Sequence, residues 1–322
     1  MSTKPIVSWA VNYLMSSGYI INNPPETVQT TPWSSVTRFL TSNGYIYLKQ
    51  TPPALSLEPD VTKILYDQFN ANVPVIIAIN KELHSFLMTD HGEPLRKFLK
   101  LNFQPDLLCQ AIKIYSAIQI AAINHVDLFI SIGVPDWRLN KLPDLYNSLI
   151  LQEDLLITDG ITSEELKILD KLRPTFLSIC EQLAQYKIPE TLDHCDFHDN
   201  NILFNKDTNK ITIIDLGETV ITHPFLSLIS CLRNAYFRYN LKETDQTYIN
   251  LQDACFENWL KFETKNNLLK IYDLAKILFY IYTTLGEYRL MIGSDPEQFK
   301  LLNRRGRMAI GLKEFIKYNI KP

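Results

Sequence analysis

Hydrophobic and polar residues alternate through the first part of the chain with the two-residue period of β-strands. Residues 36–41 and 45–49 are two such runs, separated by the turn Ser42-Asn43-Gly44. Asn-Gly between strand-like runs is a strong hairpin signal because both residues accept the positive φ angles of a tight turn. Apolar runs at residues 73–79 and 83–88 have the length and composition of further strands. This pattern predicts a small β-sheet near the N-terminus.

After about residue 91 the apolar residues recur every three to four positions, which predicts helices. One of them, at residues 105–126, is apolar on nearly all sides and is expected to be buried. Another begins at Thr162, where the spacing to Glu165 makes a capping box, and continues toward Tyr186 with a kink at Pro174. Further helices are predicted at residues 6–17, 226–239, 247–263, 268–286 and 302–318. Strands followed by helices indicate an α+β fold, with a β-rich lobe of residues 1–90 and a helical lobe of residues 91–322.

Composition narrows the class of protein. With 322 residues, 46% of them hydrophobic, the chain can bury a substantial core. The net charge of −3 and the lack of long one-signed runs argue against nucleic acid or an anionic membrane as a partner. The predicted helix at 268–285 contains Lys270, Asp273 and Lys276 and is too polar to span a membrane. Five scattered cysteines without a Cys-x-x-Cys pair indicate reduced thiols, so we expect a cytoplasmic protein without a signal peptide.

The stretch from Asp193 to Glu218 carries the candidate chemistry. Two apolar runs, residues 202–204 and 211–214, flank a polar turn and predict a short hairpin. Asp196 and Asn201 precede the first strand and Asp215 follows the second, so we expect the hairpin to bring them into one pocket. Phosphoryl transfer needs such groups, namely an oxygen base beside the acceptor hydroxyl and hard oxygen ligands for Mg²⁺. Asp196 is the candidate base, and Asn201 and Asp215 are the candidate metal ligands.

Two other interpretations compete with this one. Asp196, Asp199 and Asn200 can be ordinary turn residues, because Asp and Asn bond their own backbone in loops. A metal hydrolase would instead use side chains of this stretch as zinc or iron ligands: Asp193, His194, Asp196, His198 and Asp199. It would need further ligands, and the six histidines of the chain offer no second pair at ligand spacing.

The order His194-x-Asp196-x4-Asn201, followed by an apolar strand and Ile213-Ile214-Asp215-Leu216-Gly217-Glu218, resembles the aminoglycoside phosphotransferase and choline kinase family. That family is the small-molecule branch of the protein-kinase-like fold. The chain departs from the usual pattern with Cys195 in place of glycine and Leu216 in place of tryptophan. The resemblance implies a two-lobed kinase-like fold, Mg²⁺ and ATP or GTP as cofactors, Asp196 as catalytic base, and Asn201 and Asp215 as magnesium ligands.

The resemblance also implies a nucleotide site in the β-rich lobe. Lys49 ends an alternating strand and matches the family's phosphate-binding lysine. That role needs a carboxylate from the next helix. Glu58 is the candidate, since it stands just before Pro59, which reads as a helix start.

The remaining nucleotide contacts are expected from two loops. The loop at residues 30–35 would cover the phosphates, but it contains no glycine, so Ser34 and Ser35 are the expected donors. The hinge between the lobes would lie near Thr89 to His91, where backbone groups would meet adenine. Without the resemblance, the first stretch reads as a plain surface loop and the second as a simple turn.

The expected acceptor is the hydroxyl of a small molecule such as an aminoglycoside, an amino alcohol or a sugar. Residues 136–190 hold ten acidic against six basic side chains. This excess suits a polycationic acceptor, although a solvated helix face is the more common reason for it. The basic group at residues 304–307 is expected to face solvent. Alternatives are a nucleotide-binding module without phosphoryl transfer and a kinase with a protein or lipid acceptor; the oligomeric state is not predicted.

Overall fold

The computed structural model describes residues 5–301 and 304–320. The chain forms two compact units, and each is described by itself. The N-terminal unit draws its described residues from Met1–Glu93, Leu203–Gly217 and Leu290–Leu302. The helical unit draws its described residues from Pro94–Ile202, Glu218–Arg289 and Asn303–Pro322. Both units are therefore assembled from segments that lie far apart in the sequence.

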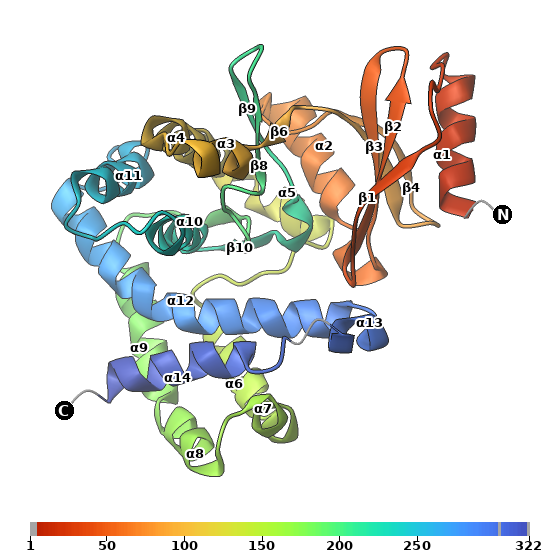
Figure 1. Cartoon of the computed structure of the whole chain (residues 1–322). Helices are drawn as coiled ribbons and strands as arrows, with labels where there is room; N and C mark the ends of the chain where they lie inside the picture. The colour runs from red at the N-terminus through yellow and green to blue at the C-terminus, as the bar shows by residue number, and fades with distance from the viewer. Residues whose placement is uncertain (1–4, 302–303, 321–322) are drawn as a thin grey trace. The chain divides into compact units, whose positions relative to one another are not determined.

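A five-stranded antiparallel sheet is the centre of the N-terminal unit, with strand order β1-β2-β3-β5-β4 (Figure 1). Its strands are β1 (Glu26–Thr31), β2 (Ser34–Thr41), β3 (Gly44–Gln50), β4 (Ile76–Asn80) and β5 (Ser85–Thr89). The predicted hairpin is confirmed, since Leu40 pairs with Tyr45 and Thr41 pairs with Gly44. Gly44 has a φ of +97°, a conformation that glycine adopts without strain.

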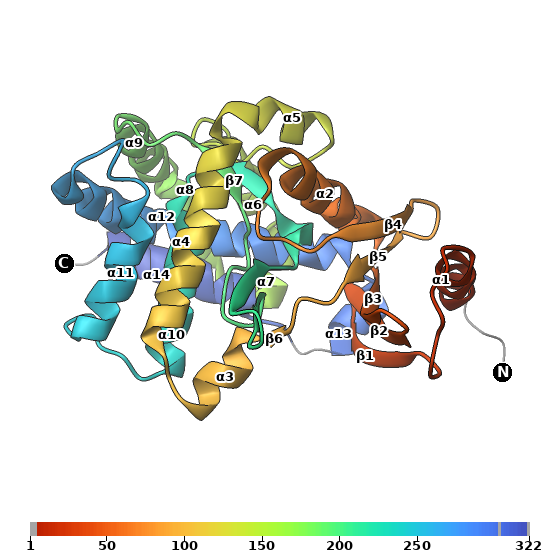
Figure 2. The ribbon, with the colours of Figure 1, turned by 90° about the horizontal axis from the view of Figure 1, so that it is seen from above.

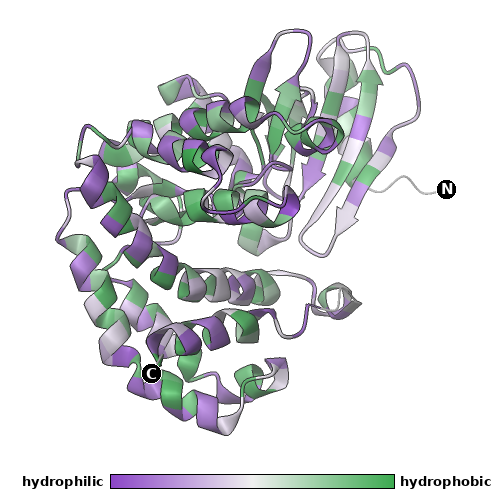
Figure 3. Ribbon diagram, turned by 60° about the vertical axis from the view of Figure 1, so that its left-hand side comes forward, coloured by the Kyte–Doolittle hydropathy of each residue, from purple (hydrophilic) through white to green (hydrophobic). Residues whose placement is uncertain are grey.

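Helices α1 (Pro5–Ser16) and α2 (Glu58–Phe69) lie on opposite faces of this sheet (Figures 1 and 2). Ala10 and Leu14 of α1 form a core cluster with sheet residues that include Leu48. Figure 3 shows the corresponding bands of hydrophobic and hydrophilic residues along the strands near the N-terminus. Because successive side chains of a strand point to opposite faces, Leu48 faces α1 and Lys49 faces α2.

The second predicted hairpin is also confirmed. It consists of β8 (Ile202–Asn205) and β9 (Lys210–Ile213), which form a three-stranded sheet with β6 (Glu93–Pro94). The Asn205 side chain accepts the backbone N–H groups of Asp207 and Thr208 and so closes the turn between the strands. The unit also contains α13 (Pro296–Leu301).

Helices and one two-stranded sheet make up the other unit. Its helices are α3 (Leu95–Leu101), α4 (Pro105–Ala122), α5 (Val126–Ser131), α6 (Leu142–Ile150), α7 (Glu153–Asp159), α8 (Ser163–Lys171), α9 (Arg173–Ala184), α10 (Phe225–Arg238), α11 (Gln246–Glu257), α12 (Lys265–Gly293, of which residues 265–289 belong here) and α14 (Arg307–Asn319). The sheet pairs β7 (Thr191–Asp193) with β10 (Val220–Thr222).

Helix α4 is the buried centre of the helical unit. Pro105–Ser131 is long and apolar enough to cross a membrane by length and composition alone. In the structure, however, Leu108, Ile112 and Ile118 are buried and α4 packs against α11 and β7. These contacts are those of a core helix in a globular unit.

Several predicted helix boundaries are wrong. The single kinked helix at 162–186 is two helices, α8 and α9, that separate at Leu172, while the capping box of Thr162 with Glu165 is present. Pro174 lies in the first turn of α9, where its missing N–H has no intrahelical partner to lose. The helix predicted at 247–263 ends at Glu257, and the one predicted at 268–286 runs from Lys265 to Gly293.

The start of the last predicted helix also moves. Residues 302–303 of the predicted span lie outside the described residues. Helix α14 begins at Arg307, because Gly306 has a φ of +90° that no helix continues. The hydrophobic periodicity of the sequence gives no signal of this interruption.

Two helical glycines give a test of the packing of α12 and α14. A Cβ at Gly311 would lie 2.7 Å from the Tyr280 carbonyl oxygen and nearer still to the Thr284 hydroxyl, whereas a Cβ at Gly286 meets nothing within 4 Å. We expect Gly311→Ala to lower the free energy of unfolding by about 2 kcal/mol or more. Gly286→Ala should raise it by about 0.5–1 kcal/mol through helix propensity. Urea denaturation of both variants measures this, and equal shifts would contradict the close approach of the two helices.

Candidate active site

Three segments of the N-terminal unit converge on one buried ammonium group. Lys49 of β3 is 6% exposed, and its Nζ lies 2.6 Å from Glu58 Oε2 and 2.5 Å from Asp215 Oδ1. Glu58 is the first residue of α2, and Asp215 follows β9 after one residue. Gly217 leaves room for this cluster, because a Cβ there would lie 3.3 Å from Glu58 Oε2. The structure thus brings together three of the predicted site residues.

The two carboxylates of this cluster have different surroundings. The Glu58 side chain is 4% exposed, and burial raises its pKa to about 7 even though Lys49 favours its charged form. The pKa of Lys49 is raised above its ordinary value, because Asp215 and Glu58 outweigh the opposing effect of burial. The Asp215 side chain is 43% exposed. The cluster therefore presents one accessible carboxylate next to a lysine that stays charged.

The helical unit brings together two other predicted residues. Asn201 donates from Nδ2 to the Asp196 carboxylate at 3.0 Å and to its backbone carbonyl at 2.9 Å. His198 Nε2 lies 3.4 Å from the other carboxylate oxygen of Asp196. The Asp196 side chain is nevertheless 47% exposed. Its direction is therefore fixed by neighbours while its carboxylate remains accessible.

A buried acid that the sequence analysis did not assign to this role anchors the loop that holds Asp196. Asp193 accepts hydrogen bonds from the Ser227 hydroxyl at 2.6 Å, from the Ser227 N–H at 3.1 Å and from the Tyr282 hydroxyl. It also accepts the Cys195 N–H at 3.3 Å. Burial raises the pKa of Asp193 to about 6, although these donors oppose the shift. Its position directly before the His194-x-Asp196 motif was the available signal, but its partners lie 34 and 89 residues away.

Helix α4 packs against the same loop and supports it. The Tyr115 hydroxyl accepts the His194 N–H at 2.8 Å, and the Tyr115 ring stacks on Phe197 with centroids 4.1 Å apart. Gln119, one turn further along α4, donates to the carbonyls of Leu192 and Pro224. Rigid support from a buried helix is what a positioned catalytic side chain requires.

Two of the five side chains of the metal-hydrolase alternative are bound to partners outside the loop. Asp193 is bonded to Ser227 and Tyr282, while Asp199 is bonded to Arg96 at 2.7 Å and to the Tyr239 hydroxyl. Within residues 5–301 and 304–320, no group of three or more His, Cys, Asp or Glu side chains is arranged to hold a metal ion. The geometry does not favour zinc or iron chemistry in this loop.

The two serines expected at the phosphates lie at the β1–β2 turn. The Ser34 N–H donates to Thr31 Oγ1 at 2.9 Å, and the two hydroxyls lie 3.2 Å apart. Ser35 pairs with Thr30 on one side and with Gln50 on the other. The turn is thus held by its own side chains, as expected where glycine is absent, and the contact of either serine with phosphate stays a prediction.

The expected hinge residues form a small hydrogen-bonded chain. The Thr89 hydroxyl lies 2.8 Å from His91 Nε2, and His91 Nδ1 lies 3.4 Å from the Thr212 hydroxyl on β9. Burial lowers the pKa of His91, which favours the neutral ring that such a chain needs. Their part in adenine binding stays a prediction.

Two residues of the motif have left-handed backbone conformations. Cys195 and Asp215 each have a φ of 66°. Glycine adopts this conformation without strain and aspartate tolerates it better than most residues, so the strain falls mainly on Cys195. This conformation accounts for the glycine that the motif usually has where this chain has Cys195.

The comparison with known families can be set against this geometry. A family model described as the phosphotransferase enzyme family matches residues 33–260, a span that includes every candidate site residue. The chain belongs to this family. It is thereby an enzyme of the phosphotransferase class.

Solved structures agree with this phosphotransferase in fold. An ethanolamine kinase from Plasmodium vivax superposes with a TM-score of 0.64 at 14% identity, covering 98% of this chain and 89% of that one. Choline kinase LicA from Streptococcus pneumoniae gives 0.60 at 14% identity, covering 96% and 99%. The GDP complex of an aminoglycoside 2′-phosphotransferase gives 0.60 at 13% identity, covering 98% and 100%. No curated protein matches the sequence. The fold is thus α+β and protein-kinase-like.

The strain at Cys195 can be measured with two variants of this phosphotransferase. Cys195→Gly and Cys195→Ala both remove the thiol, but only glycine is free of strain at a φ of 66°. We expect the glycine variant to be more stable than the alanine variant by about 1 kcal/mol in denaturant unfolding. An alanine variant of equal or greater stability would show that the loop is not strained at this position.

The raised pKa of Glu58 predicts a pH dependence of stability. Between about pH 4.5, its ordinary pKa, and about pH 7 the folded state binds the proton more tightly than the unfolded state. The unfolding free energy of the wild type relative to Glu58→Gln should therefore fall as pH rises through this window, by up to about 1.4 kcal/mol per pH unit. Urea titrations at several pH values measure the slope. Asp67→Asn, on an exposed part of the same helix, is the control, and a slope shared by both variants would dissociate the effect from Glu58.

Proposed function

We propose that this phosphotransferase moves the γ-phosphate of ATP, or of GTP, to a hydroxyl group of a small molecule in a Mg²⁺-dependent reaction. The cluster of Lys49 with Glu58 and Asp215 carries the proposal. Charge neutralisation and positioning supply most of the catalysis in phosphoryl transfer, and this cluster offers a fixed cation beside a carboxylate. The fold neighbours support a small acceptor, because they are named as ethanolamine, choline and aminoglycoside kinases.

In the N-terminal unit, Lys49 binds the nucleotide phosphates. Glu58 holds the ammonium group from α2, so that the lysine does not have to be ordered when the nucleotide arrives. Ser34 and Ser35 are the proposed donors to the phosphates from the β1–β2 turn, and the backbone around Thr89 and His91 is the proposed contact of the base. The GDP complex among the neighbours supports the use of a nucleotide and leaves GTP as an alternative to ATP.

The side chains of Asn201 and Asp215 fit Mg²⁺. Because Asn201 uses its amide nitrogen toward Asp196, its carbonyl oxygen is the atom left for a metal. Asp215 supplies a carboxylate that is 43% exposed. Both are hard oxygen ligands of the kind that Mg²⁺ prefers. When bound, the ion would neutralise charge on the phosphates.

Asp196 orients the acceptor hydroxyl and takes its proton. The hydroxyl oxygen forms the new bond to the γ-phosphorus, the bond from that phosphorus to the β–γ bridging oxygen breaks, and the nucleoside diphosphate leaves. Asn201 keeps the Asp196 carboxylate in one direction during this step. A binding module without transfer would not need an accessible, oriented carboxylate, so the catalytic interpretation is favoured over a nucleotide-binding module.

The cysteines support a reducing compartment for this reaction. Cys109, Cys180, Cys195, Cys231 and Cys255 are all free thiols. We therefore propose a cytoplasmic enzyme, where the nucleotide is also available.

Two variants test the assigned roles. Asp196→Asn should lower turnover by about 10²- to 10⁴-fold while Mg-nucleotide still raises the thermal midpoint. Asp215→Asn should lose much of that nucleotide-dependent increase. Asp207→Asn, in the exposed β8–β9 turn, is the matched control. Turnover of the Asp196 variant at the wild-type rate, measured as release of nucleoside diphosphate, would refute the mechanism.

A further inference from the structure

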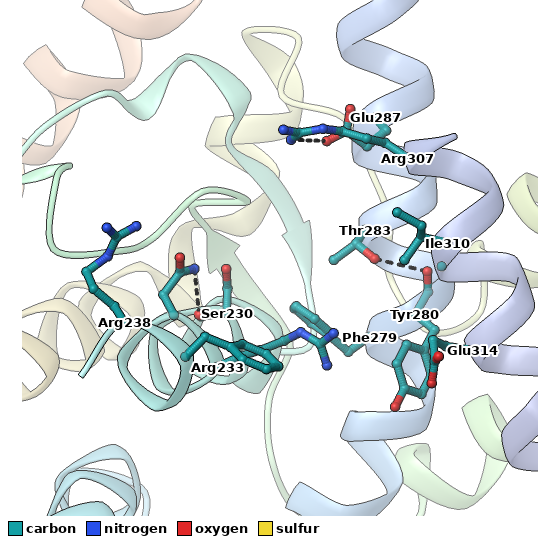
Figure 4. A pocket seen from close by; sticks show the side chains of 13 residues that line it. Ser230, Arg233, Arg238, Phe279, Tyr280, Thr283, Glu287, Arg307, Ile310 and Glu314 are labelled. Carbon is teal, nitrogen blue, oxygen red and sulfur yellow. Dashed lines mark hydrogen bonds and ion pairs between the residues drawn. The ribbon is translucent and has the colours of Figure 1, made fainter. Parts of the chain in front are cut away.

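A cavity of about 700 Å³ lies within the helical unit, between α10, α12 and α14 (Figure 4). Phe279 and Tyr280 of α12 provide aromatic surface, and Ser230 and Thr283 provide hydroxyls. The cavity is therefore suited to a polar molecule with a carbon skeleton, such as a sugar or a hydroxy acid.

Arginines dominate the charge of this cavity. Arg233 and Arg238 reach it from α10 and Arg307 from α14, against the two acids Glu287 and Glu314. Figure 4 shows Arg307 beside Glu287 and Arg233 extending from α10 toward Phe279. A guanidinium group is the side chain best suited to bind carboxylate or phosphate in a bidentate way.

The acids of the cavity are already neutralised by other cations. Glu287 forms two bonds with Arg304, of 2.5 and 3.1 Å, whereas Arg307 is 3.5 Å away and its side chain remains 54% exposed. Glu314 lies 3.6 Å from Lys317. The carboxylates thus leave most of the positive charge of Arg307 uncompensated.

Arg233 is more accessible still. It is exposed, and its guanidinium carbon lies 5.3 Å from the centre of the Phe237 ring. Among the residues that the structure describes, no carboxylate forms an ion pair with Arg233. Its contact with a ring leaves its donors available to a ligand.

The cavity adjoins the loop that holds Asp196. Arg238 Nε lies 3.7 Å from the carboxylate of Asp199, three residues after Asp196. Asp199 is bound more closely by Arg96, at 2.7 Å. The positive charge of Arg238 is therefore only partly compensated by this carboxylate. Arg238, which lines the cavity, thus connects it with the loop that holds Asp196 in the same unit.

We propose that the cavity between α10, α12 and α14 binds the acceptor, and that this acceptor is an alcohol with a carboxylate or phosphate group that Arg233 and Arg307 bind. The proposal rests on the proposed phosphoryl transfer and narrows it to anionic acceptors. An aminoglycoside or a choline-like amino alcohol would bring like charge against these guanidinium groups, which disfavours binding. The expectation that the basic group at residues 304–307 faces solvent is confirmed for Arg305 and Arg307, which are exposed, and wrong for Arg304, whose side chain is 15% exposed. Arg307 also lines the cavity.

Acceptors that share a carbon skeleton and differ in charge test the proposal. Glucose, glucosamine, gluconate and glucose 6-phosphate form one set, and glycerol, ethanolamine, glycerate and glycerol 3-phosphate form another. With Mg-ATP, ADP should be released faster with the carboxylate or the phosphate members than with the neutral and cationic ones. Comparison of gluconate and glycerate with the two phosphate esters then shows which anion the site prefers. A neutral or cationic member as the best acceptor in the sets would overturn the proposal.

Variants at the two arginines add a test at the cavity itself. Arg233→Gln and Arg307→Gln should each raise KM for an anionic acceptor by about 10- to 100-fold, the effect of losing a charged hydrogen bond. Arg173→Gln is the matched control, since Arg173 pairs with Asp170 on the surface and does not line the cavity. An acceptor KM within twofold of the wild type in both cavity variants would overturn the proposal.

A binding measurement decides the case in which no member of the sets is phosphorylated. The ligands are citrate and inorganic phosphate, with sodium chloride at equal ionic strength as the reference. Both anions should raise the thermal midpoint of the wild type and of Arg173→Gln. The midpoint of the double variant Arg233→Gln, Arg307→Gln should rise less. Equal shifts in all three proteins would refute an anion site. Failure of the proposed function is detected separately, because neither Mg-ATP nor Mg-GTP would then raise the thermal midpoint of the wild type.

Discussion

The buried ammonium group of Lys49 is the interaction on which the N-terminal unit depends. A charge with 6% exposure is costly to bury unless partners compensate it, and Lys49 has Glu58 on one side and Asp215 on the other. These partners come from α2 and from the end of β9, so satisfying one charge fixes three segments of the chain in one arrangement. Asp215 remains 43% exposed, so the part of the cluster suited to ligand binding is also the part that water can reach.

In the helical unit, too, a buried charged group lies close to an exposed one, here in the loop that holds Asp196. Asp193 is fully buried and accepts hydrogen bonds from Ser227, Tyr282 and the Cys195 backbone, while Asp196, three residues later, is 47% exposed. Buried polar networks of this kind confer a single conformation when every member is satisfied. The loop pays a local cost for its shape in the left-handed backbone of Cys195. An accessible acid is thus supported by a buried one.

Local signals in the sequence were sufficient for the hairpins, whereas the pairing of Lys49 with Glu58 was expected only from the family resemblance and its pairing with Asp215 was not predicted. Asn43-Gly44 specified the β2–β3 turn, and the two apolar runs after Asn201 specified the β8–β9 hairpin, while the roles of Asp196, Asn201 and Asp215 stay predictions. Features that depend on partners far away in the sequence could not be predicted from such local signals. The Asp193 network joins residues 34 and 89 positions apart, and the ends of α11 and α12 are set by packing and turns rather than by periodicity.

Charge counted along a segment is a poor guide to charge at a site. The acidic excess at residues 136–190 suited a cationic acceptor, yet several of these acids serve local structure. Asp136 binds Arg138, Glu165 completes the capping box of α8, and Glu190 accepts the Leu139 N–H. The arginines of the cavity, in contrast, come from two helices, with Arg233 and Arg307 74 positions apart in the sequence. Folding binds these acids to groups of their own segment and brings guanidinium groups from two helices to one cavity, so the sum of charge along a segment does not give the charge at a site.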